Sequence, residues 1–369
     1  MTEWEKVKVG DVGKVITGKT PKTSNCEYYG GNIPFLTPSD DMSVKYVRRT
    51  NKYITELGRL SVKNATLPAN AICVSCIGSD LGKVVITTQE TVTNQQINSI
   101  VVDTDKFDID FVYYSMLELG KILNFHSKTS TAVPIVNKSS FSQYEIDCPK
   151  LNTQKKIGAI LSSIDKKIEE NNQINNNLEQ QAQSIFVNMF PNISNGSCTI
   201  GDYITPKRGK SLLSKNAIFG DVPVIAGGLE PSTYHNVANT QSPVLAISAS
   251  GANAGYVSLW NIPIWSSDSS YIDSSMTDDV YFWYVLLKKR QKEIFDAQTG
   301  SAQPHIYPQH ITSMSVSNLD IEEVHSYTSI VTPIFEIIGH HKEENARLAS
   351  LRDTLLPKLM SGELDVSNI

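Results

Sequence analysis

Apolar residues recur in alternating steps of three and four along two long segments of this chain. The repeating positions are Ile157, Leu161, Ile164, Ile168, Asn171, Asn175, Leu178, Ala182, Ile185 and Met189 in the first, and Tyr327, Val331, Ile334, Ile338, His341, Asn345, Leu348, Arg352, Leu355 and Leu359 in the second. This spacing is typical of the contact face of a coiled coil. Each segment therefore predicts a long helix that requires a helical partner, and each can serve as the partner of the other.

Polar residues interrupt both faces at matching places, namely Asn171, Asn175, His341 and Asn345. Such residues could contact a ligand or partner, but in coiled coils they more often fix register and orientation. An antiparallel pair that crosses near residues 173 and 343 would bring the four into neighbouring layers. We therefore expect them to set the register of the two helices, and with it the spacing between the domains that the helices connect.

The segments outside the two helices contain short β-branched or apolar runs bounded by Gly, Pro, Asn and Asp, as is typical of strands and turns. Strands are predicted over residues 33–36, 71–74, 84–86 and 100–102, and a helix over 111–125. Pro191 ends the first long helix, and Ser361 with Gly362 ends the second. The predicted domains are 1–150, a helix at 151–190, a second domain at 191–319, and a second helix with the tail at 320–369.

The second half of the chain repeats the first. Gly10, Asp11, Gly18, Lys19 and Thr20 match Gly201, Asp202, Gly209, Lys210 and Ser211; Ser75, Gly78 and Gly82 match Ser248, Gly251 and Gly255; residues 111–114 match 281–284; and Ala132 and Pro134 match Ala302 and Pro304. Matches at four separate places indicate a duplicated unit of domain plus helix. The predicted fold is α/β (α+β): two similar globular domains separated by an antiparallel coiled coil, with an internal pseudo-twofold repeat.

The net charge of the 369-residue chain is −5, but the acidic residues are unevenly placed. Residues 320–369 hold nine acidic and four basic residues, whereas residues 1–152 hold 16 and 17. The two globular segments are near neutral and carry local basic clusters. With no apolar run long enough to span a membrane, no signal peptide and only five cysteines, we expect a cytoplasmic protein.

Residues 13–20 match the phosphate-binding P-loop pattern, which would indicate an NTPase. A P-loop lysine must open a helix, however, and here Pro21 and a turn-rich segment follow Lys19 and Thr20. The pair Cys73 and Cys76 resembles half a zinc site, but no second pair has suitable spacing, so a pair buried in a strand is favoured. We find no pattern typical of catalysis and expect no metal site and no bound cofactor.

Three segments carry a resemblance to a known family. These are the opening Trp4-x-x-Val7-x-x-Gly10-Asp11-Val12, the start of the first long helix at residues 154–157, and the ending at residues 355–364. Together with the repeat, they resemble the specificity (S) subunit of type I restriction-modification systems. The resemblance covers the whole chain.

The resemblance implies that two target recognition domains each read half of a split site in double-stranded DNA. It also implies that the helices form a spacer that docks two DNA methyltransferase (M) subunits, and that restriction/translocase (R) subunits join the complex. S-adenosylmethionine, ATP and Mg are then expected on the partner subunits. The half-site centres are expected about 10 base pairs apart, so that both domains meet one face of the duplex. The alternatives are a structural coiled-coil interaction protein and, less favoured, a P-loop NTPase.

Loops rich in basic, amide and hydroxyl side chains are the expected DNA contacts, since such groups bind phosphates and base edges. The candidates are Lys19, Lys22, Lys45, Arg48, Arg49, Asn94, Gln95 and Lys128 in the first domain, and Arg208, Lys210, Lys215, His235, Gln303 and His305 in the second. Each could also be an ordinary solvated side chain.

Overall fold

The computed structural model describes residues 4–129, 135–300 and 303–366. The chain divides into two compact units. Unit 1 comprises residues 1–168 and 347–369, and unit 2 comprises residues 169–346. Each unit therefore contains one globular domain together with part of each long helix. The domain boundaries expected from the sequence stay a prediction.

Unit 1 is built on a five-stranded sheet with the order β2-β10-β7-β8-β4, beside a four-stranded sheet with the order β5-β3-β9-β6. Strands β1 and β11 form a separate antiparallel pair. The bounds are β1 (Glu5–Lys8), β2 (Gly13–Thr17), β3 (Tyr29–Leu36), β4 (Tyr46–Val47), β5 (Tyr53–Ile54), β6 (Thr66–Leu67), β7 (Ile72–Ser75), β8 (Val84–Thr87), β9 (Thr91–Thr93), β10 (Ile97–Val102) and β11 (Glu145–Cys148). All four strands predicted in this domain are present.

Unit 2 contains a four-stranded sheet with the order β13-β19-β16-β17, a three-stranded sheet with the order β15-β14-β18, and the pair β12-β20. The bounds are β12 (Cys198–Thr199), β13 (Lys207–Arg208), β14 (Val222–Ile225), β15 (Thr233–His235), β16 (Val244–Ser248), β17 (Val257–Trp260), β18 (Trp265–Ser266), β19 (Ser269–Asp273) and β20 (Ser315–Val316).

The predicted duplication is confirmed by the order of the strands. The series β2-β10-β7-β8 of unit 1 and the series β13-β19-β16-β17 of unit 2 have the same connections and the same antiparallel pairing. The turn after the third strand of each series is also alike. Gly78 and Gly82 have φ values of 66° and 89°, and their counterparts Gly251 and Gly255 have values of 82° and 85°. These left-handed conformations explain why glycine occurs twice in each copy.

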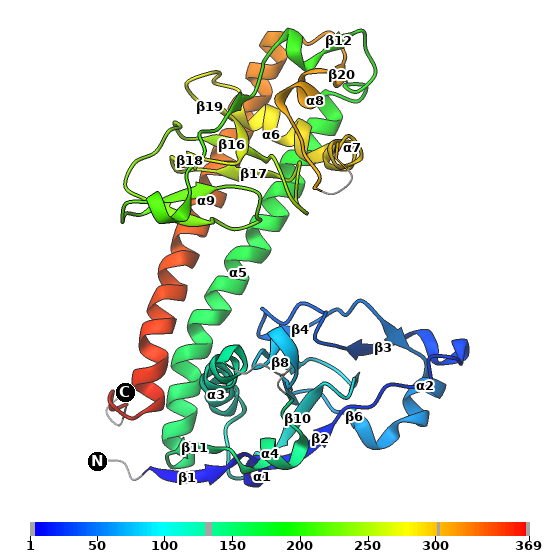
Figure 1. Cartoon of the computed structure of the whole chain (residues 1–369), viewed down its shortest axis with the longest axis vertical. Coiled ribbons are helices and arrows are strands. Elements are labelled where there is room, and N and C mark those ends of the chain that lie inside the picture. The colour runs from blue at the N-terminus through cyan, green and yellow to red at the C-terminus, as the bar shows by residue number, and fades with distance from the viewer. Residues whose placement is uncertain (1–3, 130–134, 301–302, 367–369) are drawn as a thin grey trace. The chain divides into compact units, whose positions relative to one another are not determined.

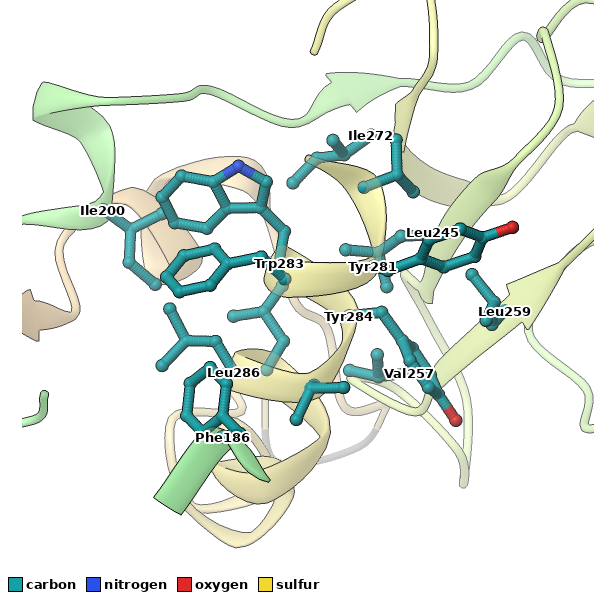
Figure 2. Packing of buried hydrophobic residues seen from close by; sticks show 14 of the residues in the cluster. Phe186, Ile200, Leu245, Val257, Leu259, Ile272, Tyr281, Trp283, Tyr284 and Leu286 are labelled. Atoms are coloured by element: carbon teal, nitrogen blue, oxygen red, sulfur yellow. The ribbon is translucent and has the colours of Figure 1, made fainter. Parts of the chain in front are cut away.

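Each sheet is covered by an apolar helix at the position expected from the repeat. In unit 1 this is α3 (Ile109–Thr129), and in unit 2 it is α6 (Val280–Lys289). Figure 2 shows Tyr281, Trp283, Tyr284 and Leu286 of α6 among apolar side chains from β16, β17 and the first long helix. Residues on both sides of α6 are apolar because the helix is buried between the sheet and that long helix.

The two long helices match the sequence prediction closely. Helix α5 runs from Leu151 to Met189, and α9 runs from Ile321 to Met360. In unit 2, residue numbers rise along α5 as the numbers of the contacted residues fall along α9: Asn171 bonds to Asn345, and Asn175 to His341. The helices therefore pair antiparallel, as predicted; Figure 1 shows them in green and in orange to red.

Several short helices were not predicted. They are α1 (Val9–Val12), α2 (Glu56–Ser61), α4 (Lys138–Gln143), α7 (Gln291–Asp296) and α8 (Pro308–Thr312), with short 3-10 turns between strands. A segment of four to six residues is too short for apolar periodicity to distinguish it from a turn. None of the helices in the described ranges is long and apolar enough to cross a membrane.

Candidate DNA interface

A turn at the end of β2 in unit 1 packs directly against the loop between β9 and β10. The backbone N–H of Gly18 donates to the carbonyl of Ile97 at 3.1 Å, and the N–H of Lys19 donates to the carbonyl of Thr93 at 2.8 Å. A Cβ atom on Gly18 would lie 2.1 Å from the carbonyl oxygen of Asn94. Only glycine allows this approach without displacing the loop.

The approach of turn and loop brings polar side chains from distant parts of the sequence together. The hydroxyl of Thr20 donates to Oε1 of Gln95 at 2.7 Å, and both Gln95 and Lys19 are exposed. The carbonyl oxygen Oδ1 of Asn94 accepts the N–H of Gln96 at 3.1 Å, which fixes the shape of the loop. We call Lys19, Thr20, Asn94 and Gln95 the first polar edge. Three of its four residues are predicted DNA contacts.

Unit 2 repeats this arrangement with different side chains. The N–H of Gly209 donates to the carbonyl of Ser269 at 2.8 Å, and the N–H of Lys210 donates to the carbonyl of Ser266 at 2.9 Å. A Cβ atom on Gly209 would lie 2.4 Å from the hydroxyl oxygen of Ser266 and 2.5 Å from its carbonyl oxygen. The same steric rule therefore selects glycine in both copies.

Side chains beside this second turn form a small charged network. Arg208 donates to Asp268 at 2.5 Å, and the hydroxyl of Ser250 also donates to Asp268. Ser250 forms an isolated β-bridge with His305, so the segment that carries His305 lies next to the network. We call Arg208, Lys210, Ser250, Asp268 and His305 the second polar edge. Three of its five residues are predicted DNA contacts.

The two edges carry the kinds of side chain that proteins use to contact DNA. Lysine and arginine bind phosphates, and arginine, amide, carboxylate and hydroxyl groups form hydrogen bonds with base edges in the major groove. The first edge offers mainly amides and hydroxyls, whereas the second offers a guanidinium, a carboxylate and an imidazole. Similar backbones thus display different chemistry.

The other predicted DNA contacts fall into separate loops. Lys22, Arg48, Arg49, Lys215 and Gln303 are exposed. The loop that precedes Arg48 and Arg49 is held by the buried carboxylate of Asp40, which accepts the N–H groups of Thr37 at 2.7 Å and Asn51 at 2.6 Å. The side chain of Lys128 lies outside the described part of the chain, so its predicted DNA contact stays a prediction. Ala132, Pro134 and Ala302 of the repeated motif also lie outside the described residues.

The expected DNA contact through Lys45 needs correction. Its side chain is only 8% exposed, and its Nζ lies 2.7 Å from a carboxylate oxygen of Asp110 and 2.8 Å from the hydroxyl of Ser162. The same ammonium group lies 4.7 Å from the ring centre of Tyr114. The ammonium group of Lys45 therefore belongs to a buried ionic cluster. The basic residues around it in the sequence suggested an exposed loop and gave no sign of this burial.

His235 also needs correction, because it is buried beneath its loop. Its Nδ1 accepts the backbone N–H of Ile218 at 3.0 Å, and its ring stands edge-on to Trp265 with centroids 5.1 Å apart. The imidazole therefore supports the loop and is not exposed for the predicted DNA contact.

The four polar residues between α5 and α9 meet within unit 2. Asn171 donates from Nδ2 to Oδ1 of Asn345 at 2.8 Å, and Nδ1 of His341 donates to Oδ1 of Asn175 at 2.8 Å. Asn171 is fully buried, and its Oδ1 has no partner among the described residues. A shift of register would place these groups against apolar side chains, so the contacts favour the register role expected for them.

The nucleotide and metal patterns weighed in the sequence find no support in the geometry. No helix opens after Lys19 and Thr20, so this turn lacks the helix N-terminus of a P-loop. Cys73 and Cys76 are both buried, and burial raises the pKa of the Cys73 thiol to about 12. The described ranges contain no group of three or more His, Cys, Asp or Glu side chains placed to hold a metal ion.

Sequence reasoning missed Asp268, Ser250 and Thr20. An acidic residue in a loop gives no sign that it will pair with an arginine sixty positions earlier. The antiparallel pairing of β13 with β19 could have suggested it, since that pairing brings residue 208 to residue 270.

Comparison with known proteins places these features in a family. The family model described as the type I restriction modification DNA specificity domain matches residues 1–180. The MjaIX specificity subunit of Methanocaldococcus jannaschii is 26% identical over 412 aligned residues, which cover 100% of this chain and 95% of the relative. The HindI specificity subunit of Haemophilus influenzae is 36% identical over 148 residues, which cover 40% of this chain and 32% of the relative.

A solved structure has the same fold. The S subunit of a type I restriction-modification system from M. genitalium matches with a TM-score of 0.61 at 18% sequence identity, covering 97% of this chain and 96% of that chain. At this identity the likeness concerns the fold alone. The family model, the full-length relative, the duplicated domains and the antiparallel helices agree, and the chain belongs to the family of type I restriction-modification specificity subunits.

Proposed function

We propose that this chain selects the DNA sequence for a type I restriction-modification complex. Each globular domain reads one half of a split site, and the helical pair fixes the distance between the halves. The observation that carries this proposal is the repeated Gly-Lys turn. Gly18 and Gly209 seat the turn against a neighbouring loop by the same two backbone hydrogen bonds, and the side chains presented there differ.

Different side chains on one backbone are what a reader of an asymmetric site requires. The amides of Asn94 and Gln95 have the donor and acceptor pattern that suits adenine, and Arg208 has the fork that suits guanine. The two halves of the DNA site are therefore expected to differ in sequence.

The chain is proposed to act through partners and without catalysis of its own. Its net charge of −5 gives little general attraction to DNA, since sequence-independent affinity comes mainly from neutralised phosphates. Two methyltransferase subunits, docked through the helices, are proposed to hold the duplex and to bind S-adenosylmethionine. Restriction/translocase subunits that use ATP and Mg are proposed to join the same complex, which would act in the cytoplasm.

The test is base-resolved mapping of methylated DNA in cells that express this chain with its methyltransferase partner. The proposal predicts one split motif, methylated in both halves, that is absent when this chain is omitted. The proposal would be contradicted if the chain were expressed with an active, soluble methyltransferase and no sequence-specific methylation were found. That result would favour a coiled-coil interaction protein.

A further inference from the structure

Phe219 is the most exposed large apolar side chain of the described residues. The residue is 97% exposed, whereas the next, Ile135, reaches 68%. It belongs to the loop between β13 and β14, near the exposed Leu213 and Ile218. Burial of a phenylalanine side chain stabilises a protein by about 2 kcal/mol, and an exposed ring lacks this stabilisation. Exposed apolar groups of this size often mark a binding surface.

The root of this loop is part of the second polar edge. The carbonyl oxygen of Lys210 accepts the indole N–H of Trp265 at 2.8 Å, and the N–H of Leu212 donates to the hydroxyl of Ser267 at 2.9 Å. Ser267 precedes Asp268, which pairs with Arg208. A ligand bound at the second polar edge would therefore meet the root of this loop at Lys210.

The far side of the loop is held equally firmly. The N–H of Ile218, next to Phe219, donates to the buried imidazole of His235 at 3.0 Å. A Cβ atom on Gly220 would lie 2.5 Å from the backbone of both His235 and Asn236, so the chain passes tightly over β15 at this point. These contacts fix the backbone on both sides of Phe219, whose ring is exposed. The ring also borders a hollow of about 560 Å³, which Tyr234 and Thr233 help to line.

The charge of the segment identifies the kind of partner. Residues 207–221 contain four basic residues and one acidic residue, Asp221, in a chain whose net charge is −5. The four are Lys207, Arg208, Lys210 and Lys215. Cations that share a stretch of chain with one exposed apolar ring fit a polyanion that offers an apolar group between its charges, which describes a DNA groove better than a protein surface.

The apolar group that the major groove offers is the 5-methyl group of thymine. Only the major groove distinguishes all four base pairs, so a domain that reads sequence by its polar edge is expected to face that groove. We propose that Phe219 contacts the methyl group of a thymine in the half-site read by the second domain, with His235 and Ser267 as positioning residues. The inference rests on the proposed function and adds one specific base contact to it.

The experiment replaces each thymine of the mapped half-site, one at a time, by uracil, which lacks the methyl group. Binding to the complex of this chain with its methyltransferase partner is measured by fluorescence anisotropy. One position is expected to weaken binding about fourfold, the factor that corresponds to one methyl-sized group. Phe219→Ala should bind the thymine DNA as weakly as the unaltered chain binds the uracil DNA, with no further loss on uracil.

Leu229→Ala is the matched control, because Leu229 is an exposed apolar residue outside the basic run. It should retain the full response to uracil, and Phe219→Leu should retain part of it. A half-site without thymine, a wild-type complex indifferent to uracil, or a Phe219→Ala complex that keeps its response to uracil would each overturn the inference. Sequence-specific methylation would persist in all three cases, whereas its absence would contradict the proposed function itself.

Discussion

The side-chain amide of Asn171 on α5 donates a 2.8 Å hydrogen bond to the side-chain carbonyl of Asn345 on α9. The same amide donates to Glu344 at 2.7 Å, and Asn345 donates to Asn172 at 2.9 Å. These bonds can form in one register only. A buried polar pair of this kind specifies alignment more than it adds stability.

Replacing Asn171 and Asn175 by Leu should therefore leave the helix content unchanged and loosen the alignment of the helices. The expected result is methylation of sites with more than one spacer length, read by base-resolved mapping, with circular dichroism to confirm the helices. The double substitution Asn176→Leu and Asn177→Leu, at exposed positions of α5, is the control and should keep a single spacer length. An unchanged spacer in the Asn171 and Asn175 variant would contradict the register role.

Substitution of either turn glycine should damage one half-site and spare the other. In Gly18→Ala the new methyl group meets the carbonyl oxygen of Asn94, and in Gly209→Ala it meets Ser266. Overpacking of this kind costs about 1–3 kcal/mol, and we expect the loop that carries Asn94 or Ser266 to shift in response. Mapped methylation should lose sequence preference in the half assigned to the altered domain. Loss of preference in both halves, in a variant that stays folded, would argue against independent reading.

Lys45→Met should lower stability without changing the methylated sequence. The substitution leaves the carboxylate of Asp110, itself 32% exposed, without its cation. We expect the free energy of unfolding to fall by about 2 kcal/mol, less than the full cost of an orphaned buried charge. Urea unfolding measures the change, and Lys22→Met, at an exposed position, is the control. If Lys45→Met were as stable as the unaltered chain but methylated a different DNA sequence, Lys45 would contact DNA after all.

A pH dependence is expected from His325 at the start of α9. Its Nδ1 lies 2.8 Å from Oδ2 of Asp279, and this hydrogen bond raises the pKa of His325 above 6.5. Protonation is thus favoured in the folded state, so the stabilisation is fully present below pH 6.5 and is lost as the pH rises through the raised value. His325→Gln should remove this loss of stability from urea titrations taken at successive pH values. His340→Gln, on the exposed side of α9, should not.

The two long helices could be predicted because their signal is local in the sequence, whereas much of the candidate interface depends on contacts that are not. The spacing of Ile157, Leu161 and Ile164 is a local property of the chain, and α5 and α9 follow it to within about two residues. The partners of a polar side chain are not local. Lys45 is buried because Asp110 and Ser162, 65 and 117 positions away, converge on it.

The two polar edges could be predicted only in part. The repeat identified Lys19 and Lys210 as equivalent. The structure adds that each donates its backbone N–H to a distant residue, Lys19 to Thr93 and Lys210 to Ser266, which lie 74 and 56 positions further along. Phe219 was missed altogether, because an aromatic residue in a sequence is expected in a core. The loop that carries it is held by the hydrogen bonds from Ile218 to His235 and from Leu212 to Ser267, which no pattern in the sequence indicates.

The most direct test of the account is to exchange the second recognition domain. Residues 197–318 are replaced by the corresponding domain of another specificity subunit, and methylated DNA is mapped at base resolution with the same methyltransferase partner. The account predicts that one half of the split motif changes to that of the donor while the other half and the spacer length remain. A motif in which both halves change, or neither does, would contradict the claim that each domain reads its own half.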